Sequence, residues 1–69
     1  MRLTDAQRRF LAALQGDALT DRRMGPALED KSLCTETSPG VWTLTPSGHY
    51  WRGEACLIEA AAAQRRFRR

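Results

Sequence analysis

The sequence is poor in the residues and patterns that identify disulfide-rich, metal-binding, phosphate-binding and membrane proteins. Among its 69 residues are one histidine and two cysteines, and Cys34 and Cys56 form no CxxC pair. This content predicts neither a disulfide framework nor a metal site, and we expect both cysteines to be small buried residues. There is no glycine-rich phosphate loop, and no apolar run approaches the roughly 18 to 20 residues that a membrane span requires. We therefore expect no cofactor, no small-molecule substrate and no membrane partner.

The sequence also lacks the features of a secreted protein and of an enzyme. No signal-like apolar run follows Met1, which predicts a cytoplasmic protein. His49 is the only histidine, and it lies close to Ser47 in the sequence. A catalytic pair of these residues would need an orienting carboxylate, an oxyanion-binding site and a pocket, and the sequence indicates none of them. We expect a protein without catalytic activity.

The short chain limits the size of the hydrophobic core. A chain of 69 residues has room for one domain, and 42% of its residues are hydrophobic. Ten of those residues are alanines, so few large apolar side chains are left to fill a core. Such a core favours association with a partner subunit.

Positive charge is concentrated at the C-terminal end. The net charge at pH 7 is +3, although residues 1–64 carry seven basic and eight acidic side chains, a net charge of −1. We therefore predict a single domain over residues 1–64, followed by a basic tail over residues 65–69. The cations of this tail are Arg65, Arg66, Arg68 and Arg69.

Helical patterns occupy the first half of the chain. Apolar residues from Leu3 to Leu14 recur with helical spacing, and Thr4 followed by Gln7 is typical of a capping box. Gly16 supplies the predicted stop of this first helix. Residues 17–32 are less regular, and we predict two short helices there. The first is capped by Thr20 or Asp21 and ends near Met24, and Pro26 opens the second.

The second half of the chain indicates a β-hairpin followed by a long helix. Strand-favouring residues lie on either side of the turn at residues 38–40, and Trp42 and Leu44 are expected to rest on the helices with Leu33. Thr45 and Pro46 predict the start of a helix that runs to about Phe67. This helix carries an apolar stripe wider than so small a body needs, which predicts a homodimer.

Two segments carry a resemblance to a known family. Residues 28–33, LEDKSL, resemble the end of a recognition helix that runs into a wing strand, and the family usually has glycine at the position of Ser32. Residues 42–48, WTLTPSG, resemble the second wing strand turning into a closing helix. With the first helix, these segments are similar to the winged helix-turn-helix family of bacterial and phage DNA-binding domains. The resemblance implies an α+β, mainly helical fold with a two-stranded wing and a long C-terminal helix.

The resemblance implies a small DNA-binding transcriptional regulator. In that interpretation Arg22, Arg23 and Lys31 lie near the groove of double-stranded DNA, and the four tail arginines contact phosphates. The segment from Thr20 to Lys31 is neutral, with three basic and three acidic residues, so Arg22 and Arg23 have Asp21 or Glu29 as alternative partners.

A second hypothesis is a phage-type inhibitor or adaptor that uses the same scaffold to bind a host protein. Tyr50 and Trp51 are adjacent on a helix, so they cannot both face one core, and one of them is left for an interface. In a core this small, however, Trp42 and Trp51 are more often packing residues. The residues assigned to a protein interface are Tyr50, Trp51, Ile58 and Phe67.

Overall fold

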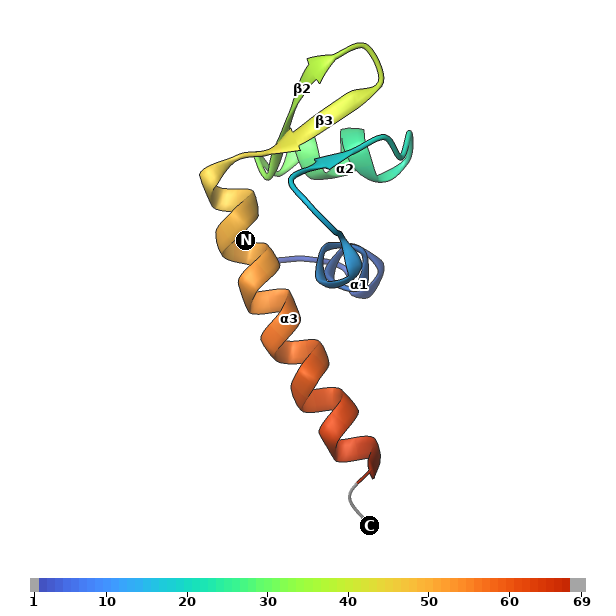
Figure 1. Ribbon diagram of the computed structural model, residues 1–69, viewed down its shortest axis with the longest axis vertical. Coiled ribbons are helices and arrows are strands. Elements are labelled where there is room, and N and C mark those ends of the chain that lie inside the picture. Colours follow the sequence, from blue (N-terminus) through green and yellow to red (C-terminus); the bar gives the residue numbers. More distant parts are fainter. Residues whose placement is uncertain (1, 68–69) are drawn as a thin grey trace.

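The computed structural model describes the backbone of residues 2–67 and the side chains of residues 2–66 (Figure 1). It confirms an α+β, mainly helical fold, with the hairpin and the long closing helix where the sequence predicts them. The elements are α1 (Asp5–Ala13), β1 (Ala18–Leu19), α2 (Met24–Asp30), β2 (Cys34–Ser38), β3 (Val41–Leu44) and α3 (Pro46–Phe67).

Helix α1 begins with the predicted capping box. The Thr4 hydroxyl accepts a hydrogen bond from the Gln7 amide at 3.1 Å, and the Gln7 side chain accepts one from the Thr4 amide at 3.0 Å. The helix ends earlier than Gly16, because Leu14 already has an extended backbone and is the C-cap residue. Gly16 has a φ of 80° and turns the chain toward β1 after the helix has ended.

The prediction of two short helices over residues 20–31 is wrong, because a single helix, α2, forms there. The Asp21 carboxylate accepts hydrogen bonds from the amides of Arg23 and Met24, both at 2.8 Å, and so satisfies two N–H groups at the start of the helix. Pro26 is the third residue of α2 rather than the first. Proline is tolerated there because amides in the first helical turn have no partner within the helix.

The chain leaves α2 through a turn that explains the unusual residue at position 32. Ser32 has a φ of 62°, in the left-handed region that favours glycine. The Ser32 amide donates to the Glu29 carbonyl at 2.9 Å, and the Leu33 amide donates to the Leu28 carbonyl at 3.0 Å. These two bonds define a Schellman motif, in which Leu28 and Leu33 form the accompanying apolar contact. The backbone thus adopts a glycine-like conformation at the position where the winged-helix resemblance expects glycine.

The sheet has three antiparallel strands in the order β1-β3-β2. The hairpin of β2 and β3 is the predicted one, and its turn is held by a hydrogen bond of 2.9 Å from the Gly40 amide to the Glu36 carboxylate. Strand β1 is an addition to the prediction, with Ala18 opposite Thr43 and Leu19 opposite Trp42. A strand of two residues is too short to show an alternating pattern in the sequence.

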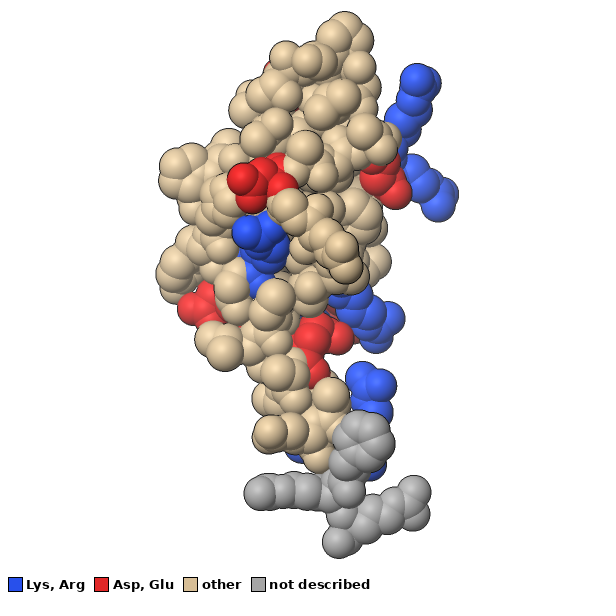
Figure 2. Space-filling view, in the orientation of Figure 1, with Lys and Arg blue, Asp and Glu red and all other residues tan. Residues whose placement is uncertain are grey.

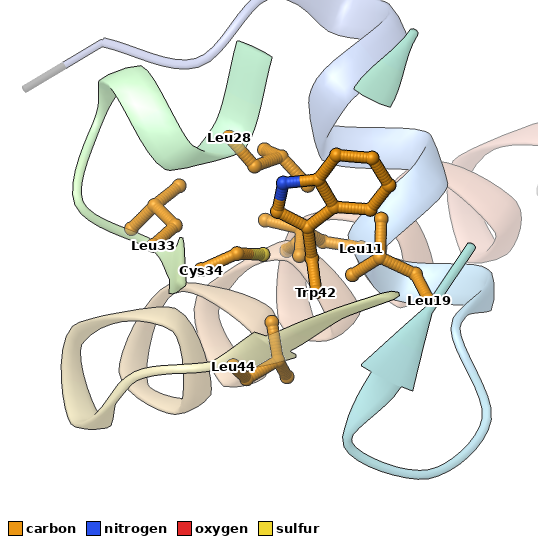
Figure 3. Close-up of a cluster of buried hydrophobic side chains, with 8 residues drawn as sticks. Leu11, Leu19, Leu28, Leu33, Cys34, Trp42 and Leu44 are labelled. Carbon is orange, nitrogen blue, oxygen red and sulfur yellow. The ribbon is translucent and has the colours of Figure 1, made fainter. Parts of the chain in front are cut away.

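The core lies between the sheet and the three helices (Figure 3). Leu11, Leu28 and Leu33 are its largest fully buried side chains. Trp42 is also buried, as predicted, and its indole Nε1 donates to the Glu29 carboxylate at 3.1 Å. The remaining buried apolar residues are Leu19, Cys34, Leu44 and Ala55.

Helix α3 starts at Pro46, and the hydroxyl of Thr45 accepts a hydrogen bond from the Gly48 amide at 3.1 Å. Polar contacts hold the helix to α1 and to the segment that follows it. Arg8 of α1 binds Glu59 at 3.0 Å, and Arg52 donates to the carbonyl of Gly16. The far end of α3 extends away from the sheet (Figure 1), and the molecule measures 47 × 20 × 18 Å. None of the described helices has both the length and the apolarity needed to cross a membrane.

Candidate nucleic-acid interface

Arg22 and Arg23 lie in the turn that precedes α2, and both side chains are exposed. Within residues 2–66 neither guanidinium group makes an ion pair. The two acidic residues that the sequence offers as partners have other partners. Asp21 accepts from the backbone at the start of α2, and the Glu29 carboxylate accepts from the Trp42 indole and from the Glu36 amide, the latter at 3.3 Å.

The electrostatics of Asp21 agree with this geometry. Hydrogen bonds from the Met24 amide and then the Arg23 amide hold the pKa of the Asp21 carboxyl below its usual range. Its charge is therefore retained at neutral pH and directed at the start of the helix. The positive charge of Arg23 lowers the pKa of Asp21 further, although the guanidinium groups of Arg22 and Arg23 are exposed and neither makes an ion pair within residues 2–66.

A hollow of about 410 Å³ lies between this turn and the tip of the hairpin. Among residues 2–66 the hollow is lined by one cation, Arg22, together with Glu36, Pro39, Gly40 and Trp42. The hairpin itself, residues 34–44, contains no lysine or arginine. Positive charge at this end of the molecule therefore comes from the turn before α2 rather than from the hairpin.

The outward side of α2 and the residue after it carry no free cation toward this hollow. The exposed residues of α2 are Pro26, Glu29 and Asp30. Lys31 follows the helix, at the opposite end from Arg22 and Arg23, and its ammonium group donates to the Gln7 side chain and the Arg2 carbonyl, both at 2.6 Å. The structure does not bring Lys31 together with the two arginines. It holds the N-terminal segment against α2 instead.

Further arginines are exposed on other elements. Figure 2 shows basic side chains spaced along one edge of the molecule, from the level of α2 to the far end of α3. Arg9 on α1 is one that sequence reasoning missed, although its place next to the apolar stripe of that helix indicates an outward position. Within residues 2–66, the exposed arginines without an ion pair are Arg2, Arg9, Arg22, Arg23, Arg65 and Arg66. Arg68, Arg69 and the Phe67 side chain lie outside the described residues.

Helix α3 exposes large apolar side chains. The exposed fractions of Tyr50, Leu57 and Ile58 are 60%, 68% and 47%. Tyr50 is thus the outward member of the adjacent pair, whereas Trp51 is partly buried and packs against the core. Leu57 was not assigned to an interface from the sequence, although it lies two helical turns after Tyr50. The prediction that Cys56 is buried is wrong, because its place in α3 is exposed, whereas Cys34 is buried as predicted.

The surroundings of His49 are those of a structural contact. Its Nδ1 lies 3.3 Å from the Arg52 guanidinium, and its Nε2 lies 3.9 Å from the Asp17 carboxylate. Arg52 also lies 3.8 Å from Asp17, so these three residues connect the segment after α1 to α3. In the described part of the chain no group of three or more histidine, cysteine or acidic residues is placed to hold a metal ion.

The fold and these surfaces define a class, a small α+β protein with three helices and a three-stranded antiparallel sheet. Comparisons of the chain with protein-family models, with curated protein sequences and with solved structures gave no match.

Proposed function

We propose that this chain is a small winged-helix protein that binds double-stranded DNA through Arg22 and Arg23 and acts as a transcriptional regulator. One observation carries the proposal. Two adjacent guanidinium groups stand in solvent before α2 while the nearby carboxylates of Asp21 and Glu29 are held by other groups. Unpaired arginines of this kind are the groups that neutralise phosphates and release counterions.

The arrangement of elements supports the winged-helix part of the proposal. A helix comes directly before the hairpin, the hairpin takes the place of the wing, and a long helix follows it. The left-handed backbone of Ser32 supports the same interpretation, because it stands where the family usually has glycine. In this scheme α2 occupies the position of the recognition helix.

The charges around α2 favour contacts with phosphates over contacts with base edges. The exposed side chains of Glu29 and Asp30 repel the DNA backbone along the outward side of the helix. The cations of Arg22 and Arg23 lie at its start, and Arg22 lines the hollow between this turn and the tip of the hairpin. Phosphate contacts fix the position of a protein on DNA and carry little sequence information. The proposal therefore implies strong dependence on salt and weak discrimination between sequences.

The test is fluorescence anisotropy of a mixed-sequence duplex, titrated with the full chain at several salt concentrations. We expect Arg22→Ala/Arg23→Ala to weaken binding and to lower the salt slope by about two, since each lost phosphate contact removes about one. Arg65→Ala/Arg66→Ala removes the same charge from the end of α3 and is the matched control. It is expected to have the smaller effect.

Three results would contradict the proposal. If both double variants lose the same amount of DNA affinity, the DNA is attracted by the net charge of the protein and not by a site at α2. A chain ending at Gln64 that loses all binding would place the contacts in the tail. Absence of binding by the full chain even at low salt would remove the DNA hypothesis altogether.

A further inference from the structure

Within residues 2–66, one side of α3 is largely uncovered. Helical spacing places six residues along it, and Glu59, which binds Arg8 of α1, lies on the opposite side of the helix. Its three large apolar residues are about half exposed or more, which is unusual in a chain with so few of them. We call this surface the outer face of α3. It consists of Tyr50, Glu54, Leu57, Ile58, Ala61 and Arg65.

Size and charge both change along the outer face. The half nearer the sheet carries the bulky ring of Tyr50 and the acid Glu54, whose nearby carboxylate raises the pKa of Tyr50 above its usual value. The far half carries the small Ala61 and the cation Arg65. Leu57 and Ile58 lie between the two halves. The face is therefore complementary to itself when one copy is reversed.

We infer that the outer face of α3 is covered by the α3 helix of a second copy of this chain, running antiparallel and crossing it near Leu57 and Ile58. A two-fold axis at this point places Tyr50 of each copy opposite Arg65 of the other, and Glu54 opposite Ala61. Side chains on a helix lean toward its N-terminus, so the carboxylate of Glu54 reaches toward the level of the partner's Arg65. Parallel pairing would instead place Glu54 against Glu54 and Arg65 against Arg65.

A hollow of about 170 Å³ lies along the edge of the outer face. Its apolar lining comes from Leu3, Trp51, Ala55 and Ile58. In the antiparallel pair the partner's Leu57 stands opposite Ile58, at the rim of this hollow, and packs into it. Arg2, Arg8 of α1 and Glu54 complete the lining of this hollow. The pairing uses no residue of the turn that carries Arg22 and Arg23, and it does not depend on DNA binding.

The first experiment measures the mass of the full chain by sedimentation equilibrium over a wide range of concentrations. We expect a dimer, and we expect its dissociation constant to rise about tenfold or more in Leu57→Asp. The substitution puts a carboxylate in place of the leucine side chain at the centre of the apolar contact. Ala6→Asp adds the same charge at an exposed position of α1 and is the matched control, with little expected effect. Circular dichroism of both variants checks that the fold is retained.

The second experiment tests the orientation of the two helices. Glu54→Arg and Arg65→Glu are each expected to weaken the dimer several-fold at low salt, and the combined variant is expected to recover most of the affinity. Tyr50→Phe removes the hydroxyl near Glu54 without changing the charge, and it is expected to leave the dimer nearly unchanged.

The inference is overturned by any of four results. They are a monomer at every concentration, a dimer that Leu57→Asp leaves intact, no recovery in the combined variant, and a monomer that uses Leu57 to bind a different protein. The last result would assign the outer face to a foreign partner.

Discussion

The two halves of α3 share one helix but have different surroundings. Between Pro46 and Ala55 the helix contributes Gly48 and Ala55 to the buried interior. Among residues 56–66, all of which the structure describes, none is buried. The first half is therefore held by tertiary packing, and the second half depends much more on its own helical tendency. A continuous helix in the secondary structure thus contains two regions with different sources of stability.

Local interactions account for the far half. The four alanines of residues 60–63 have the highest helix propensity of any residue type, and Arg65 and Arg66 place positive charge at the helix C-terminus, where the helix dipole favours it. The ion pair between Arg8 and Glu59 adds one contact with α1. A helix as short as the far half would have only marginal stability in water on its own. The packed half therefore acts as the nucleus from which the far half extends.

The largest difference between the two regions is expected from identical substitutions of leucine. Leu11→Ala removes a fully buried side chain and is expected to lower the free energy of unfolding by about 2–5 kcal/mol. Leu57→Ala is expected to change the stability of the monomer by less than about 0.5 kcal/mol, because that side chain is mostly in solvent. Urea denaturation of dilute samples measures both. Similar losses would contradict the division of the molecule into these regions.

The two cysteines provide a probe in each region. Cys34 is buried, and burial followed by the charge of Glu29 raises the pKa of its thiol, whereas Cys56 is exposed on α3. A thiol reagent is therefore expected to label Cys56 about a hundredfold or more faster than Cys34, which becomes accessible only on unfolding. Mass spectrometry with Cys34→Ser and Cys56→Ser variants assigns the two rates. Equal rates would mean that the core opens readily.

Two glycines of α3 are expected to respond in opposite directions. A Cβ at position 48 would collide with the Leu33 carbonyl oxygen, so Gly48→Ala is expected to destabilise the protein by about 1–3 kcal/mol. A Cβ at position 53 meets nothing within 4 Å, so Gly53→Ala is expected to stabilise it by about 0.5–1 kcal/mol through helix propensity. Thermal unfolding of the two variants measures both effects. If Gly48→Ala stabilises the protein, α3 does not pack closely against the Leu33 backbone in the turn between α2 and β2.

A smaller gain in the packed region is expected from Ser32→Gly. The left-handed conformation at φ 62° is strained for serine and natural for glycine. The substitution is expected to raise the free energy of unfolding by up to about 1 kcal/mol. Ser47→Gly is the control, because residue 47 lies in a helix where glycine is unfavourable. Loss of stability in Ser32→Gly would indicate that the turn has another conformation.

The smallest effect is expected from pH. The pKa of Asp21 is lower in the folded chain than in the unfolded chain, so the ionised carboxylate favours the folded state. Its contribution is complete above the unfolded pKa and is lost as the pH falls through the folded pKa. Asp21→Asn is therefore expected to reduce the acid sensitivity of urea unfolding. If the wild type and the variant lose stability in parallel, Asp21 does not cap α2 in solution.

Local signals in the sequence predicted much of the fold. The capping box at Thr4, the hairpin turn at residues 38–40 and the helix start at Pro46 each depend on a few neighbouring residues. The prediction of two helices over residues 20–31 is wrong because Gly25 and Pro26 do not interrupt α2. Proline fits the first turn of α2, and Gly25 is required because the Trp42 ring occupies the space of a Cβ. That second reason depends on a residue 17 positions later in the chain.

The candidate sites were harder to predict because their properties depend on contacts between distant residues. Arg22 and Arg23 were named from the sequence, but only the folded chain places Asp21 and Glu29 with other partners. The contact of Lys31 with Gln7 joins α1 to the residue after α2 and leaves no local pattern. Tyr50 and Ile58 followed from helical spacing, whereas the exposure of Leu57 and Cys56 depends on how the other elements pack against α3.

The length of α3 has a consequence for how the protein moves through water. The radius of gyration is 12.7 Å, compared with about 11 Å for a compact chain of this size. A particle of 47 × 20 × 18 Å turns faster about its long axis than end over end. The amide N–H vectors of α3 lie nearly along that axis, so their NMR relaxation reports the slow rotation. The same elongation makes a single chain leave a gel-filtration column early, where it can be mistaken for a pair.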